Sequence, residues 1–173
     1  GLSDALVEDN SMYIGNDPSS STSTAQYNVA VGATALDAIT TGDKNVAVGY
    51  DALTANTTGA QNTTYGFESL KSNTAGDYNT ASGYHSMRSN TEGSYNTASG
   101  SFSLRSNTTG IQNTASGYRS LYYNSTGTRN IAMGYGALDA ADTENDNLAI
   151  GYDALGGSIA GGEFNVAIGN YSM

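Results

Sequence analysis

Apolar and polar positions alternate along this chain in a short unit that repeats almost from end to end. The unit begins N-x-A-x-G and recurs in steps of 17 residues, with a final step of 18, at Asn28, Asn45, Asn62, Asn79, Asn96, Asn113, Asn130, Asn147 and Asn165. A tenth, degenerate copy runs from Ser11 to Gly15. Each unit holds two apolar stretches of about five residues with period-2 alternation, separated by turn signals. This spacing predicts two short strands per unit rather than a helix.

Repetition at this period predicts a solenoid. One short coil cannot bury its own apolar face, whereas stacked coils bury it against one another, each strand pairing with its equivalent one coil away. We therefore expect an all-β parallel solenoid of about ten 17-residue coils over residues 11–173, preceded by a lead-in or cap over residues 1–10. At about 4.8 Å per coil the rod would be about 45 Å long. We interpret the chain as a fragment of a longer protein, with any anchoring or tip domain outside it.

Three positions of the unit have a structural interpretation. Glycine at the fifth position predicts a corner with positive φ or close backbone approach. These glycines include Gly32, Gly49, Gly66, Gly83, Gly100, Gly117, Gly134 and Gly151. The opening asparagines predict a ladder of stacked amides, with a simple role in turns as the alternative, and they include Asn45, Asn79, Asn96 and Asn113. Leu or Met at the ninth position is expected to fill the interior, as at Leu53, Leu104 and Leu121.

The second and fourth positions of each unit are expected to lie outside the coil, because side chains alternate along a strand. Toward both ends of the chain they are aliphatic: Val29, Val31, Val46, Val48, Ile131, Met133, Leu148, Ile150, Val166 and Ile168. In three middle units they are Thr80/Ser82, Thr97/Ser99 and Thr114/Ser116. Monomers rarely expose contiguous apolar rows, so we expect these rows to meet in a closed cyclic oligomer. The number of chains is left open by the alternation.

The aliphatic units, N-V-A-V-G from Asn45, N-I-A-M-G from Asn130 and N-V-A-I-G from Asn165, resemble the head repeats of trimeric autotransporter adhesins. The longer unit, with its Tyr-x-Ala-Leu and Asn-Thr-Thr-Gly segments, resembles repeats of bacteriophage tail fibres. The resemblance extends from Ser11 onward. It implies a left-handed parallel β-roll that is homotrimeric, extracellular on a virion tail fibre or a bacterial cell surface, and active in attachment to a host cell or surface. Of the two, a tail fibre is favoured, although the Thr/Ser units depart from the aliphatic pattern.

Composition narrows the range of partners. Leu, Ile, Val and Phe total only 26 of 173 residues, a level typical of disordered chains, so the repeat is the main argument for order. The net charge of −10 disfavours nucleic acid, whose phosphates would be repelled. No apolar run approaches the roughly 18 residues of a membrane span, so we expect no membrane insertion of this segment.

Catalytic chemistry has few candidates. There is no cysteine, and the one histidine, His85, is expected to be a surface residue. The acidic residues fall mainly in variable positions, so neither a Ser-His-Asp triad nor a facing carboxylate pair is indicated, and we expect no enzyme. The acidic loop formed by Asp139, Asp142, Glu144 and Asp146 replaces the N-T-T-G segment of the eighth unit. Its oxygens could suit Ca²⁺; a plain acidic loop is the alternative, and no other cofactor is indicated.

Tyrosine is unusually frequent, with 13 residues. Six units have Tyr or Phe at the sixth position, among them Tyr50, Tyr84, Tyr118, Tyr135 and Tyr152. When the coils stack, these rings would cover the glycine corner and stiffen the rod. Alternatively they would contact a receptor or glycan surface, since a Tyr side chain offers a large flat surface with a polar hydroxyl at its tip. The regular Thr/Ser rows support a different hypothesis, an ice-binding or other ligand-binding solenoid.

Overall fold

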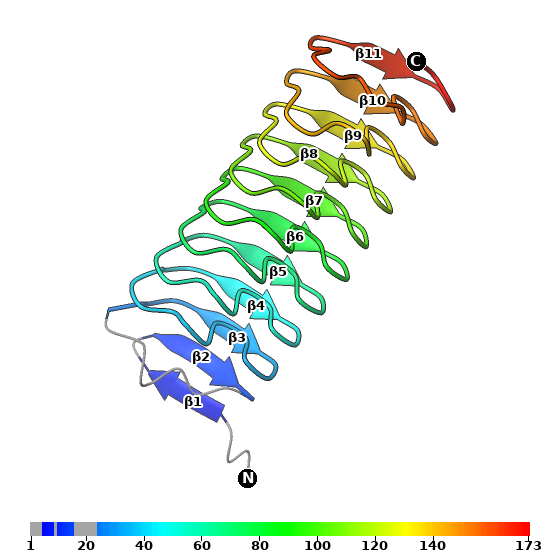
Figure 1. Ribbon diagram of the computed structural model, residues 1–173. Coiled ribbons are helices and arrows are strands. Elements are labelled where there is room, and N and C mark those ends of the chain that lie inside the picture. Colours follow the sequence, from blue (N-terminus) through cyan, green and yellow to red (C-terminus); the bar gives the residue numbers. More distant parts are fainter. Residues whose placement is uncertain (1–4, 9, 16–23) are drawn as a thin grey trace.

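The computed structural model of the chain describes residues 5–8, 10–15 and 24–173. Within these ranges every regular element is a strand, and the eleven strands form one sheet in chain order from β1 to β11 (Figure 1). Strands β2 to β11 run parallel, and the chain winds through a β-solenoid of about nine turns. β1 (Ala5–Glu8) pairs antiparallel with β2 (Ser11–Ile14). The all-β solenoid predicted from the repeat is confirmed.

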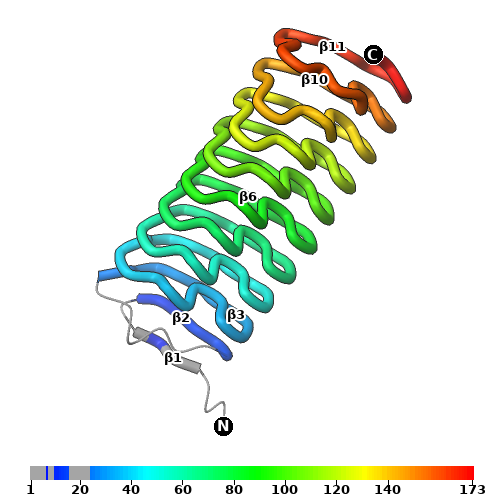
Figure 2. The backbone as a smooth tube through the Cα atoms, in the orientation of Figure 1, coloured from blue at the N-terminus to red at the C-terminus, as the bar shows by residue number. Residues whose placement is uncertain are grey.

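The remaining strands cover the second to fourth positions of each unit. They are β3 (Val29–Val31), β4 (Val46–Val48), β5 (Thr63–Tyr65), β6 (Thr80–Ser82), β7 (Thr97–Ser99), β8 (Thr114–Ser116), β9 (Ile131–Met133), β10 (Leu148–Ile150) and β11 (Val166–Ile168). Each residue pairs with its equivalent in the next coil, as Val29 does with Val46. Figure 2 shows the same coil outline repeated along the rod.

The prediction of two strands per coil is wrong for the described residues, in which each coil has only one strand. In the second apolar stretch, the seventh and ninth positions adopt positive φ, for example Asp51 at 53° and Leu53 at 52°. Such left-handed residues interrupt a strand. The backbone still pairs between coils here: the N–H of Asp51 donates to Ala33 in one neighbouring coil, and that of Leu53 donates to Ser69 in the other. These inter-coil bonds offset the cost of the left-handed conformation.

The interior is filled mainly by stacked alanine and leucine side chains. The third-position alanines, including Ala47, Ala81, Ala98, Ala115 and Ala132, are fully buried, and so are Leu53, Leu104 and Leu121 at the ninth position. The prediction of an inward Ala and Leu face is therefore confirmed for these coils. Met173, at the same ninth position, is 96% exposed, so the prediction is wrong there.

The opening asparagines form the predicted ladder inside the rod. The Asn96 amide nitrogen donates to the Asn79 side-chain oxygen at 3.2 Å and to the Gly110 carbonyl at 2.9 Å. In turn, the backbone N–H of Asn113 donates to the Asn96 side-chain oxygen at 2.9 Å. Each buried amide thus satisfies a backbone group as well as its neighbour, a stronger role than that of a turn residue.

A second amide ladder was not predicted. The asparagines that open the N-T-T-G segments are also fully buried: Asn56, Asn73, Asn90, Asn107 and Asn124. Each of the last four donates to the side-chain oxygen of the one before it at 2.7–2.9 Å. Each of the five also donates to the glycine carbonyl three residues on. These asparagines therefore close the turn of their own coil and also link one coil to the next.

The fifth-position glycines form a corner that excludes any side chain. Gly100 has a φ of 135°, and a Cβ there would lie 2.6 Å from the Gly117 carbonyl oxygen. Gly49 and Gly134 meet the same obstruction, at 2.3 Å and 2.2 Å from the corresponding oxygen of the next coil. The sequence prediction of positive φ and close approach is confirmed, and the obstacle is the next coil's backbone, which cannot rotate away.

Candidate functional site

The outward side of the sheet is the most extended surface that the strands create. The aliphatic side chains predicted to lie outside the coil do so, while the alanine between each pair is buried. The exposed fraction reaches 41% for Ile131, 45% for Met133, 68% for Val166 and 67% for Ile168. Parallel pairing places these side chains directly above one another from β9 to β11. They form a continuous apolar row, as do the valines of β3 and β4.

The middle of the same face is polar. Thr80 and Ser82 are exposed, and so are Thr97 and Ser99, with Thr114 and Ser116 partly covered. Tyr65 lies at the boundary between the valine rows and this polar block, paired with Val48 on one side and Ser82 on the other, and is 49% exposed. Sequence reasoning overlooked this residue, although its fourth position in the unit places it on the outward face.

The sixth-position aromatic residues form the expected stripe. Ring centroids are 5.2 Å apart for Tyr50 and Phe67, and 4.9 Å apart for Tyr135 and Tyr152, with nearly parallel planes. The stripe continues across Ser101, because Phe102 lies edge-on between Tyr84 and Tyr118 at 5.3 Å and 5.9 Å. The five predicted tyrosines are 41–50% exposed. The rings therefore support one another and still present one surface to solvent.

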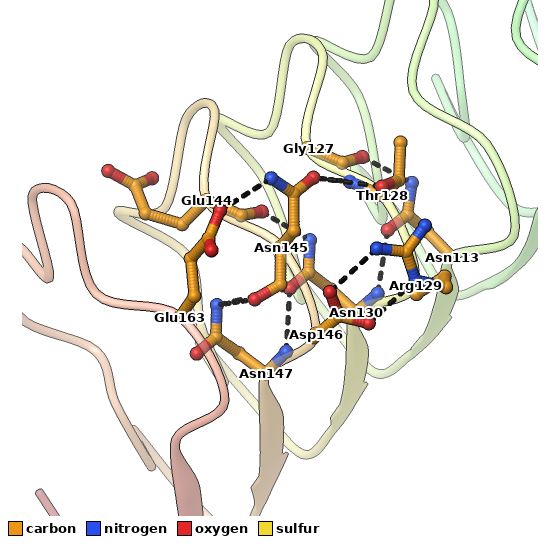
Figure 3. Close-up of polar contacts among 10 residues, drawn as sticks. All are labelled: Asn113, Gly127, Thr128, Arg129, Asn130, Glu144, Asn145, Asp146, Asn147 and Glu163. Atoms are coloured by element: carbon orange, nitrogen blue, oxygen red, sulfur yellow. Dashed lines mark hydrogen bonds and ion pairs between the residues drawn. The ribbon is translucent and has the colours of Figure 1, made fainter.

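The structure does not bring the four residues of the acidic loop together as a metal site. Asp146 pairs with Arg129 at 2.6 Å, and Figure 3 shows the two side chains facing each other. The Glu144 carboxylate accepts backbone N–H groups of Asp142, Thr143 and Gly161 at 2.9–3.1 Å. Asp139 lies 3.7 Å from Arg119. Within the described part of the chain, no group of three His, Cys, Asp or Glu residues could hold a metal ion.

The pKa values of this loop follow from those separate partners. Burial alone would raise the pKa of Glu144, but the backbone N–H groups outweigh it and lower the pKa. Burial raises the pKa of Asp139, against the opposing charge of Arg119. The hydrogen bond from Arg129 lowers the pKa of Asp146. Glu144 and Asp146 are thus held by hydrogen bonds within the loop and to the neighbouring coils.

A charged ridge runs along the seventh and tenth positions of the middle coils, and sequence reasoning missed it. Lys71 contacts Asp51 and Glu68 at 2.8 Å each, and Arg88 contacts Glu68 at 2.5 Å. The hydrogen bonds from Lys71 and Arg88 lower the pKa of Glu68 to about 2. A seventh-position acid thus pairs with the tenth-position cation 20 residues later. That spacing, one coil plus three residues, was the available signal.

His85 belongs to this ridge and is not the surface residue that was expected. Its side chain is only 15% exposed, and its ring lies 3.9 Å from that of Tyr84 and 5.5 Å from that of Phe102. Its Nε2 atom is 3.1 Å from a Glu68 oxygen but lacks the geometry of a hydrogen bond. Burial lowers the pKa of His85. The ring is therefore neutral near pH 7 and serves as part of the aromatic packing.

Comparison with known proteins adds no relative. No family model matches the chain, and neither the curated proteins nor the solved structures include a match.

None of the described ranges contains a helix that could cross a bilayer.

Proposed function

We propose that this chain is a structural and adhesive segment of a homotrimeric extracellular fibre that attaches to a host cell or surface, a phage tail fibre ahead of a bacterial adhesin. The observation that carries the proposal is the pair of apolar rows on the outward face of the sheet. Val166 and Ile168 are about two-thirds exposed, and burying an aliphatic side chain fully is worth roughly 1.5–3 kcal/mol. Contact between these rows of different chains would bury them on a common axis.

The same assembly suits attachment. Three chains present each coil's surface three times on a stiff rod, so weak contacts add up through avidity. The left-handed winding and the threefold state both rest on the resemblance of the N-x-A-x-G units to adhesin and tail-fibre repeats. We expect no catalytic activity, and a receptor or glycan on the cell surface as the partner.

Light scattering tests the assembly. The proposal predicts a mass near three times the 17.8 kDa of one chain. Replacing Val46 and Val48 together by Asp would place like charges in the interface and should give a monomer or an unfolded chain. The matched control places the same two charges at Gln61 and Gln112, which are exposed, lie outside the strands and already have positive φ. A monomeric wild-type chain would overturn the proposal.

Ice binding is the second candidate, favoured by one observation. Thr80, Ser82, Thr97 and Ser99 are exposed on adjacent parallel strands, and so form a regular hydroxyl grid. The grid is small and interrupts apolar rows on both sides, which is why we rank it second. Thermal hysteresis in a monomeric wild-type chain, lost in Thr97→Lys, would favour ice binding over the fibre.

A further inference from the structure

One cation of the charged ridge lacks the partner that its neighbours have. Lys71 and Arg88 each contact the acid 20 residues earlier, Asp51 and Glu68 respectively. For Arg105 that position is His85, which is neutral, and the seventh position of its own coil is Phe102. No carboxylate of the described residues lies within ion-pair distance of Arg105. The pairing of acid and cation seen at Lys71 and Arg88 is therefore missing at Arg105.

A second, independent observation concerns the guanidinium nitrogens. The Nε atoms of Arg105 and Arg119 are both buried and have no acceptor in the described structure. Both guanidinium groups lie over the ring of Tyr122, at 5.6 Å and 4.5 Å from its centroid. A buried donor without an acceptor costs free energy. The ring orients two adjacent cations but supplies no oxygen to their N–H groups. Arg119 has a longer contact of 3.7 Å to Asp139, whereas Arg105 has no carboxylate partner in the described structure.

We propose that Arg105 and Arg119, held over the ring of Tyr122, bind the acidic group of a saccharide, a sugar that carries a single carboxylate or sulfate. Arginine presents forked donors that match such an oxyanion. Tyr123 lies edge-on to Tyr122, with 4.7 Å between the ring centroids, and Tyr118 lies 5.9 Å from Phe102. These rings are 52% and 42% exposed and offer flat area with polar tips to the sugar ring. This inference rests on the proposed attachment function and names the ligand class.

The surroundings favour a sugar over other anions. The net charge of −10 opposes a polyanion such as nucleic acid, because long-range repulsion grows with its charge. Arginine clusters also recognise acidic peptides, whereas extended peptides gain main-chain hydrogen bonds from a free sheet edge. On this ridge the backbone already bonds between coils, as Ser106 does to Tyr122 and Arg119 to Ser101. A small anion held by two guanidinium groups requires neither a sheet edge nor a groove.

The test is calorimetric titration of the whole chain at low salt. The probes are an oligosaccharide with one uronic acid, its singly sulfated counterpart, the neutral parent sugar, inorganic sulfate and an acidic peptide. We expect one or both acidic sugars to bind at least tenfold more tightly than the neutral sugar and inorganic sulfate, and the stronger of the two identifies the oxyanion. Equal binding of the neutral sugar would overturn the role of the cations, and tighter binding of the peptide would overturn the ligand class.

Two variants locate the site. Arg105→Gln should weaken binding of the acidic sugar at least tenfold, because charge-assisted hydrogen bonds are lost. His85→Glu restores the acid 20 residues before Arg105, and should weaken binding equally while leaving the melting temperature unchanged or higher. The control is Arg129→Gln, since Arg129 already has its partner Asp146; it should bind as the wild type does. Wild-type affinity in His85→Glu would overturn the site.

The outcome separates this inference from the proposed function. A trimer that attaches to cells but ignores acidic sugars would overturn the saccharide site alone. A monomer that binds the acidic sugar through Arg105 would overturn the fibre alone.

Discussion

The two sides of each strand differ in how freely their residues vary from coil to coil. On the inward side, Ala occupies the middle of nearly every strand and is buried, as are the two amide ladders. On the outward side, the same rows change from Val to Thr to Ile along the rod. An inward side chain has its own equivalents above and below, so it must fit two copies of itself. An outward side chain contacts solvent or a binding partner, so the outward residues can vary to suit a partner without disturbing the stack.

The largest effect is expected at the glycine corner. Gly100→Val should lower the free energy of unfolding by about 3 kcal/mol or more, because φ is 135° and a Cβ would meet the Gly117 carbonyl. Chemical denaturation measures the loss. Gly157→Ala is the control, since the only atom within 4 Å of its Cβ would be the Met173 sulfur at 4.0 Å. Equal stability of the two variants would show that the corner is not closed by the next coil.

The amide ladder should come next. Asn96→Ala leaves the backbone N–H of Asn113 without its acceptor, and each buried orphan costs about 1–3 kcal/mol. We expect a loss of about 2–4 kcal/mol in unfolding free energy. Asn165→Ala is the matched control: Asn165 donates to Asn147, but its side-chain oxygen accepts no hydrogen bond in the described structure. If both substitutions cost the same, the ladder does not act between coils.

The charged ridge tests whether outward residues can also be coupled between coils. The folded-state pKa of Glu68 is about 2, below its ordinary 4.5, so the folded state holds the carboxylate charged. This contribution is full above about pH 5 and is lost as the pH falls toward 2. Allowing for solvent screening, we expect about 1–2 kcal/mol. Glu68→Gln should remove that part of the acid sensitivity measured by denaturation at pH 7 and pH 3, while exposed Glu92→Gln should not.

The smallest effect is expected on the polar block of the outward face. Thr97→Val keeps the shape of an exposed side chain and should change the unfolding free energy by less than about 0.5 kcal/mol. The buried Ala98→Val, one residue away, adds volume to a filled interior and should cost about 1–3 kcal/mol. Similar melting temperatures for the two would contradict the contrast between inward and outward rows.

Much of the fold could be predicted because the repeat encodes it locally. The 17-residue period determines the stack, alternation of Val46, Ala47 and Val48 determines which side chains lie inside, and Gly49 marks the corner. These are properties of consecutive residues, and the structure confirms them. The outward position of the aliphatic rows follows from the same alternation.

Other features depend on contacts between coils, and only the tertiary structure decided them. Leu53 adopts positive φ, which a local pattern does not favour for a leucine, because its backbone N–H donates to the Ser69 carbonyl of the next coil. In the sequence Asn90 looks like a turn residue, and only the structure shows its side-chain hydrogen bonds to Asn73 and Asn107 of the neighbouring coils. In the charged ridge, Glu68 forms an ion pair with Arg88, 20 residues later. In the acidic loop, Asp146 forms an ion pair with Arg129 and does not share a metal ion with the other acidic residues. In each case the deciding partner belongs to another coil, and its distance depends on how the coils are offset, which no single unit of sequence specifies.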